Sequence, residues 1–511
     1  MTLDGTLDQL LGMPNVPAPP VNHFQTGDVN VPVGSTWVNA PFSDALDVGD
    51  YRRPSLRGWY WQNVLHHDFH VRTRLTTFWI NHFGMADAGP QRKEYKAIRL
   101  FDEFGLGSIK TMIEKITIEP AMLRFLDGQD NNRWSPNENF ARELMEVFTI
   151  QKGAQTGNGA GADYTFYNEQ DVVAIGRVLT GWRVANEWSR EDGNLYGYFD
   201  PNRHDPDAKQ LSDRFDNAVI YRPEGEWEEE YKDVINVIFG RHETARALCR
   251  RIYRFFVNDQ ITPRIISQVI DPLADVMRDA DYDMATTLRA LFASEHFFDM
   301  SVRGPFIKNP MEFMVSVVRP FGGYRHLGLD LETGGAETLR TRYDCALSHH
   351  WRCSNLGFDF LEVPAVAGWA AYHQSPQYHR AWIGSATLKQ RKTWVDTCTG
   401  SGIWTRVDGD NDNYDPRPLD WFGFVNGLDN PAEPSELVAE SVQIFLPREL
   451  HADQLTALKN ELLRGLDDQE WRQQYAAYLA SPLNPSVANP IRDRIKGFYR
   501  ALFSLAEFHL I

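Results

Sequence analysis

Histidine and carboxylate side chains at several places in the chain could exchange protons with a substrate or bind a divalent metal ion. The candidate catalytic residues are His82, Glu143, His204 and Asp205, and the candidate metal ligands are these four together with Glu146. Imidazole nitrogens and carboxylate oxygens are common ligands of divalent ions, and buried examples of both groups act as general acids and bases. A divalent metal is therefore the cofactor that these residue types allow.

His82 continues the apolar stripe of a predicted helix, with His67 on the same side. The other members of the stripe recur at spacings of four and three residues: Val71, Leu75 and Phe78. A buried neutral imidazole needs hydrogen-bond partners for both of its nitrogens. Two interpretations stay open for His82: a core histidine paired with a carboxylate or carbonyl, and a metal ligand or general base.

The next motif places Glu143 and Glu146 on one flank of a predicted helix, together with Asn139. Glu143 borders the apolar stripe of this helix, and a carboxylate in such a place must be paired, protonated or bound to a metal. Glu143 could therefore belong to a metal site. It could equally form a salt bridge with Arg142 or Arg177 on a packed helix.

Helix starts are well marked in this part of the chain. Ser135 is the predicted N-cap of the helix that carries Glu143, with Pro136 as its first residue and Glu138 completing a capping box. The capping box accounts for Glu138 without a catalytic role. A second capping box is predicted at Asn168, with Asp171 returning the hydrogen bond.

His204 and Asp205 lie in an irregular, polar stretch at residues 186–226. Polar residues in irregular segments are easily exposed and are often functional. Helical proteins build metal sites from inward-facing carboxylates and histidines on different helices. We therefore expect a functional cleft, if the protein has one, where His82, Glu143 and the His204-Asp205 pair meet. The paired Glu-x-x-His motifs of di-iron bundles do not occur in the sequence.

Two later segments also suggest binding. The acidic residues Asp408, Asp410, Asp412 and Asp415 resemble a calcium loop, but the usual glycine and glutamate are replaced, and a solvated acidic loop is the alternative. Residues 350–405 are crowded with aromatic side chains that could stack on a ligand or cover a core: Trp351, Trp369, Tyr372, Tyr378, Trp382, Trp394 and Trp404. Cys345 and Cys353 could form a disulfide in an oxidising compartment, which the sequence leaves open.

Composition and charge narrow the classes of partner. The chain has 511 residues, of which 42% are hydrophobic, and its formal net charge is -17. Such an acidic chain repels phosphate backbones, so we expect no nucleic-acid partner. It has no apolar run of about 18 residues, so no membrane span is expected. Its first residues lack a basic start followed by an apolar segment, so no signal peptide is recognised.

Helices are the elements that must position the candidate residues. The sequence predicts an all-α fold: a large multi-helix domain with an irregular, aromatic-rich segment and few or no strands. We divide the chain into an extended N-terminal arm at 1–55, a main helical domain at 56–322, an irregular aromatic-rich segment packed on this body at 323–435, and C-terminal helices completing the body at 436–511.

Several motifs resemble the bacterial domain-of-unknown-function family 1800, in the order that the family shows. They are FWINHF at 78–83, PNENFARELMEVFT at 136–149, NEQDV at 168–172 with LTGW at 179–182, His204-Asp205 with Lys209, KNPME at 308–312, and VPAVAGW at 363–369 with AWI at 381–383. The family's late glycine pair is replaced by residues 370–373, AAYH. The resemblance implies a helical fold, a bacterial source, members that are commonly exported, and a sulfatase-like partner protein. It implies no reaction.

Two hypotheses about function follow. In the first, the protein is a metal-dependent enzyme for an extracytoplasmic substrate, with His82 and Glu143 as ligands or acid/base groups and His204 and Asp205 completing the site. In the second, it is a noncatalytic structural or partner-binding protein whose buried polar residues fix helix packing. Geometry discriminates between them: groups open to a pocket favour the enzyme, and closed pairing with arginines favours the scaffold.

Overall fold

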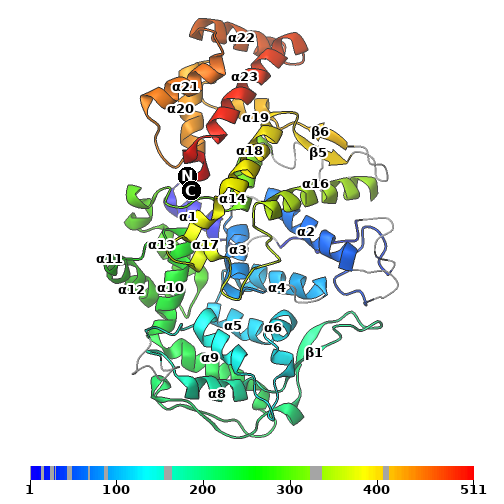
Figure 1. Ribbon diagram of the computed structural model, residues 1–511, viewed down its shortest axis with the longest axis vertical. Helices are drawn as coiled ribbons and strands as arrows, with labels where there is room; N and C mark the ends of the chain where they lie inside the picture. Colours follow the sequence, from blue (N-terminus) through cyan, green and yellow to red (C-terminus); the bar gives the residue numbers. More distant parts are fainter. Residues whose placement is uncertain are drawn as a thin grey trace. The chain divides into compact units, whose positions relative to one another are not determined.

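The computed structural model describes residues 2–12, 16–23, 28, 30–42, 49–66, 70–85, 90–154, 164–322, 336–406 and 414–511. Helices dominate the fold (Figure 1), and within these residues the strands form three short antiparallel pairs, which confirms the all-α prediction. The chain divides into two compact units. Unit 1 comprises Met1–Leu56, Asp68–Phe298 and Phe360–Tyr378, and unit 2 comprises Arg57–His67, Asp299–Asp359 and His379–Ile511.

Unit 1 holds most of the candidate residues. Its helices are α1 (Leu3–Leu11), α3 (Arg72–Phe83), α4 (Gln91–Phe104), α5 (Ile109–Thr117), α6 (Pro120–Phe125), α7 (Glu138–Glu143), α8 (Glu169–Val178), α9 (Glu230–Gly240), α10 (His242–Phe256), α11 (Pro263–Ile265), α12 (Asp271–Asp279), α13 (Met284–Phe292) and α17 (Ala370–His373). A π-helical turn, η2 (Leu144–Phe148), continues α7. The hairpins are β1 (Trp182–Ala185) with β2 (Tyr196–Phe199), and β3 (Lys209–Gln210) with β4 (Val219–Ile220). Helix α2 (Gly49–His66) contains the division between the units.

The helix starts test the capping predictions directly. Asn168 and Asp171 form the predicted capping box of α8, which confirms that prediction. The capping box at Ser135 is wrong, because α7 begins at Glu138 and its N-cap is Asn137. The side-chain oxygen of Asn137 accepts hydrogen bonds from the next backbone N–H groups at 2.9 and 3.3 Å, so it satisfies the free donors of the first turn.

Unit 2 contains helices α14 (Pro310–Val318), α16 (Ala336–Asn355), α18 (Ser385–Thr399), α19 (Trp421–Val425), α20 (Pro434–Phe445), α21 (Ala452–Leu463), α22 (Asp468–Ala480) and α23 (Pro485–Phe503), with the hairpin β5 (Ile403–Arg406) and β6 (Tyr414–Arg417). The long helices α16 and α18 fall in the stretch expected to be irregular. Both bury polar side chains, His349 and His350 on α16 and Arg391 on α18. These residues interrupt the apolar stripe from which a helix is recognised in a sequence.

The late aromatic and acidic residues have different surroundings. Trp369, Trp382 and Trp394 are buried, as core cover requires, whereas Trp351 and Trp404 are about half exposed. Asp408, Asp410 and Asp412 lie outside the described residues, as does His67, and Asp415 is exposed on β6.

All four cysteines are free and buried. Among the described helices, none is both long enough and apolar enough to cross a membrane.

A buried carboxyl at the start of α6 gives a pH-dependent stability. Burial raises the pKa of Glu119 to about 7 from an ordinary value of 4.5, although Lys96 opposes the shift. Because the folded state binds this proton more tightly than the unfolded state, the free energy of unfolding falls as pH rises from 4.5 to about 7. The shift corresponds to a loss of about 3 kcal/mol.

Replacing Glu119 by glutamine should abolish this fall, because the amide stays neutral. We expect Glu119→Gln to be more stable than the wild type at about pH 8 and equal to it near pH 4, as measured by urea unfolding. The control is Glu103→Gln, at an exposed position of α4. Equal pH profiles for wild type and Glu119→Gln would contradict the prediction.

Candidate functional site

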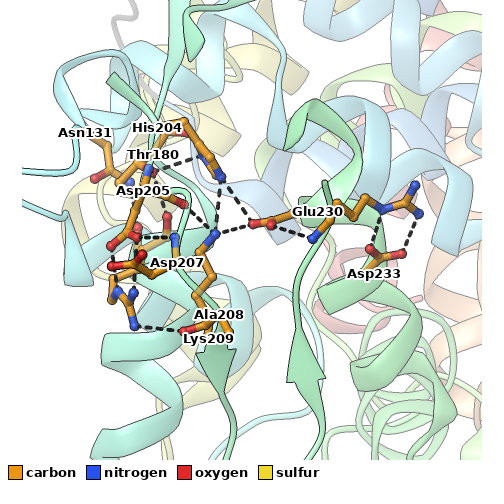
Figure 2. A network of polar contacts seen from close by, with 12 residues as sticks. Asn131, Thr180, His204, Asp205, Asp207, Ala208, Lys209, Glu230 and Asp233 are labelled. Atoms are coloured by element: carbon orange, nitrogen blue, oxygen red, sulfur yellow. Dashed lines mark hydrogen bonds and ion pairs between the residues drawn. The ribbon is translucent and has the colours of Figure 1, made fainter. Parts of the chain in front are cut away.

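His204 and Lys209 form a closed polar network with Glu230 of α9 (Figure 2), and all three side chains are fully buried. His204 Nδ1 donates to the Thr180 carbonyl oxygen at 2.9 Å, and Nε2 lies 3.2 Å from Glu230 Oε2. Lys209 Nζ lies 2.5 Å from the Asp205 carbonyl oxygen, 2.5 Å from Glu230 Oε2 and 3.3 Å from His204 Nε2. The ammonium therefore donates to the Asp205 carbonyl oxygen and to Glu230.

The carboxylates of this network are also paired. Arg177 of α8 binds Asp205 through two hydrogen bonds, of 2.7 and 3.1 Å. Burial works against the charged form of Asp205, but these bonds hold its pKa below the ordinary value. Burial likewise opposes the charge of Glu230, while hydrogen bonds from His204 and Lys209 keep the pKa of Glu230 below its ordinary value. The other Glu230 oxygen accepts the backbone N–H of Arg222 at 3.1 Å.

Glu143 and Glu146 lie in a different polar cluster. Glu146 Oε1 lies 2.5 Å from Lys152 Nζ, and Oε2 accepts a hydrogen bond from the Tyr167 hydroxyl at 3.3 Å. Burial and the neighbouring Glu146 raise the pKa of Glu143. Neither arginine proposed as a partner forms an ion pair with Glu143. Arg142 pairs with Glu169, and Arg177 pairs with Asp205.

His82 is buried, and both of its ring nitrogens are engaged. Nε2 lies 3.0 Å from the carbonyl oxygen of Phe148, at the end of the π-helical turn, and Nδ1 lies 3.3 Å from Arg251 Nη1. Since a guanidinium only donates, Nδ1 accepts and Nε2–H donates. Burial and the Arg251 charge lower the pKa of His82 well below its ordinary value, so the imidazole is neutral.

A pocket opens beside His82 in unit 1. Its aromatic walls are Phe78, Phe255 and Tyr372, and its polar residues are Asn81, His82, Gln151, Arg251, Arg254 and His373. Among the described residues that line the pocket there is no aspartate or glutamate.

Backbone geometry around the pocket departs from regular helix. The π-helical turn η2 ends at Phe148, and Gln151 adopts a left-handed conformation with φ of 63°. π-Helical turns and positive φ values at residues other than glycine both cost free energy and occur often at functional sites. Here they direct the Phe148 carbonyl toward His82 and place Gln151 in the pocket wall.

The segment before α17 is tied to the end of α3. Asn81 Oδ1 accepts the backbone N–H of Trp369 at 2.9 Å, across 288 positions of sequence. Gly368, with φ of +92°, leaves no room for a side chain, because an added Cβ would lie 2.3 Å from Asn81 Oδ1. Two motifs that are far apart in sequence thus meet at the pocket.

Arg251 and Arg254 were not among the residues singled out from the sequence. Both project from α10, and in the described part of the chain no carboxylate forms an ion pair with either. Burial and the neighbouring Arg254 lower the pKa of Arg251 to about 10. A signal was present, because Arg251 falls three residues after Leu248 and four before Phe255, within an apolar stripe.

The predicted residues therefore occupy three environments. His204 and Asp205 share one network, Glu143 and Glu146 another, and His82 lines the pocket. Within the described ranges no group of three or more His, Cys, Asp or Glu side chains could hold a metal ion. The catalytic and metal-binding roles of these residues stay predictions.

Comparison with known proteins gives one match. The family DUF1800, described as a protein of unknown function, matches residues 4–485. No curated protein and no solved structure matches the chain. The match extends over both units, so the pocket and the Lys209 network both lie within the matched residues.

Proposed function

We propose, on the premise that the chain belongs to DUF1800, a family of proteins of unknown function, that it binds a small oxyanion in the pocket beside His82. The observation that carries the proposal is the pair of arginines, Arg251 and Arg254, in a pocket whose described lining holds no carboxylate. Guanidinium groups bind phosphate, sulfate and carboxylate through paired, charge-assisted hydrogen bonds.

Electrostatics supports an anionic ligand. Two guanidinium groups three residues apart on one helix repel each other, and partial burial adds a desolvation cost, as the lowered pKa of Arg251 reflects. An anion between them would offset both costs. The chain as a whole carries a charge of -17, so this positive pocket is a local feature and not part of a basic surface.

His82 has a positioning role in this proposal. Its neutral Nδ1 accepts a hydrogen bond from Arg251, and its Nε2–H is held by the Phe148 carbonyl, so the ring fixes one end of the guanidinium. The remaining N–H groups of Arg251 are then available to a ligand. This role competes with the metal-ligand role predicted for His82, because both ring nitrogens are engaged.

Replacing Arg251 should weaken oxyanion binding strongly. We expect isothermal titration with inorganic phosphate to show binding by the wild type, with affinity reduced about 10- to 100-fold in Arg251→Gln, because hydrogen bonds to charged groups are lost. The double variant Arg251→Gln/Arg254→Gln should show no binding. Arg246→Gln is the matched control, since Arg246 lies on the same helix and pairs with Asp271. Phosphate, sulfate and acetate all failing to bind the wild type would refute the proposal.

The noncatalytic hypothesis is supported at a second place. The closed pairing of Lys209, His204 and Glu230 is what a network that fixes helix packing requires. We propose that this network holds the irregular segment against α8 and α9. A metal-dependent enzyme and a sulfatase-like partner stay predictions from the sequence.

A further inference from the structure

The polar side chains of the pocket differ in whether they can donate a hydrogen bond to a ligand or accept one from it. His373 differs from the others because it can accept. Its Nδ1 lies 3.1 Å from the Trp369 carbonyl oxygen, so Nδ1 donates to that carbonyl. In the neutral ring Nε2 then keeps its lone pair. Desolvation lowers the pKa of His373, the hydrogen bond to the Trp369 carbonyl opposes this shift and the Arg251 charge adds to it, and the residue stays exposed. His373 therefore brings a hydrogen-bond acceptor to the pocket.

The remaining polar side chains bring donors. The Asn81 oxygen accepts from the Trp369 N–H, so its amide nitrogen is the free end. The Gln151 oxygen accepts from Arg250 Nη2 at 3.2 Å, so its amide nitrogen is also free to donate. Arg251, Arg254 and these two amide groups therefore bring N–H donors to the pocket, whereas His373 Nε2 brings a lone pair.

We propose that the pocket selects an oxyanion that still carries a hydroxyl proton, with inorganic hydrogenphosphate as the ligand, and that His373 is the specificity-determining residue. The charged phosphate oxygens accept from Arg251 and Arg254, and the P–OH group donates to His373 Nε2. The inference rests on the proposed oxyanion binding and names the ligand of that same pocket.

Chemistry separates three tetrahedral anions at about pH 8. Hydrogenphosphate, sulfate and methyl phosphate are all doubly charged, because the second ionisation of a phosphate monoester occurs near pH 6. Only hydrogenphosphate has an O–H donor. Sulfate and methyl phosphate would each set an oxygen lone pair against the lone pair of Nε2, and a hydrogen-bonding site rejects a ligand that leaves its polar group unpaired.

The test is isothermal titration of the full chain at about pH 8 with each of these three anions. We expect the wild type to bind hydrogenphosphate about tenfold more tightly than sulfate or methyl phosphate. In His373→Ala this preference should disappear through weaker phosphate binding, with sulfate binding unchanged. In His373→Lys, which places a donor there, sulfate should bind more tightly than phosphate. His242→Ala, at a histidine that pairs with Asp275, is the control.

The outcomes separate the two proposals. Equal binding of the three anions by the wild type, or a preference that survives in His373→Ala, would overturn the role of His373 and leave oxyanion binding intact. Absence of binding by all three anions would overturn the proposed function itself, and the inference with it. Thermal unfolding of each variant shows whether the pocket is still folded when binding is measured.

Discussion

Replacing Lys209 by methionine should lower the free energy of unfolding by about 3–5 kcal/mol, because the substitution leaves the buried carboxylate of Glu230 without its cation. The ammonium and the carboxylate are fully buried, with Lys209 Nζ 2.5 Å from Glu230 Oε2. The methionine side chain preserves most of the lysine volume, so a packing defect contributes little. The loss should appear in urea unfolding followed by tryptophan fluorescence.

A second variant separates the charge from the packing. Adding Glu230→Gln to Lys209→Met removes the unpaired charge, and we expect it to restore part of the lost stability. Lys232→Met is the matched control, since Lys232 pairs with Glu229 at the surface and should lose under about 1 kcal/mol. If Lys209→Met lost no more than Lys232→Met, the network would not contribute to stability as argued.

Gly368→Ala should lose both stability and oxyanion binding. An alanine at φ of +92° is strained, and its Cβ would lie 2.3 Å from Asn81 Oδ1 and 2.5 Å from the Asn81 carbonyl oxygen. Backbone strain alone costs about 1–3 kcal/mol, and relief of the clash requires the segment before α17 to move away from α3. We expect a total loss of about 3 kcal/mol or more. Phosphate affinity should fall at least about tenfold, because Tyr372 and His373 move with the segment.

Gly225→Ala is the matched control for this prediction. Gly225 is also in unit 1 with φ of +93°, and an added Cβ there meets nothing within 4 Å. The control variant bears the same backbone strain without the clash, and it lies outside the pocket lining. Equal losses of stability in Gly225→Ala and Gly368→Ala would show that the contact with Asn81 has no energetic effect.

The motif at residues 136–149 shows how local and distant effects combine at the pocket. The residues after α7 have a helical pattern in sequence, but the structure turns them into a π-helical turn followed by a left-handed Gln151. The π-helical turn and the left-handed residue cost backbone free energy, which interactions within the segment do not offset. The hydrogen bond from His82 to Phe148 and the one from Arg250 to Gln151 come from other helices. The departure from regular helix is therefore a property of the folded unit.

By itself, the sequence determined the features that depend on neighbouring residues. The all-α class, the capping box at Asn168 and the burial of His82 all follow from helical periodicity and capping chemistry. These are interactions over three or four positions, which a chain read in order displays directly. The wrong N-cap at Ser135 has the same origin, because Ser135 and Asn137 both satisfy the local rule and a contact with Asn131 favours the second.

Only the tertiary structure decided which polar groups meet. His82 and Arg251 are 169 positions apart, and Trp369 binds Asn81 across 288. Glu230, which completes the Lys209 network, carries no local signal of its role. Such pairings depend on how helices pack, and a histidine on an apolar stripe gives the same pattern whether its partner is a metal, a carbonyl or a guanidinium. The sequence therefore indicated that His82 needs partners, and the fold selected Phe148 and Arg251.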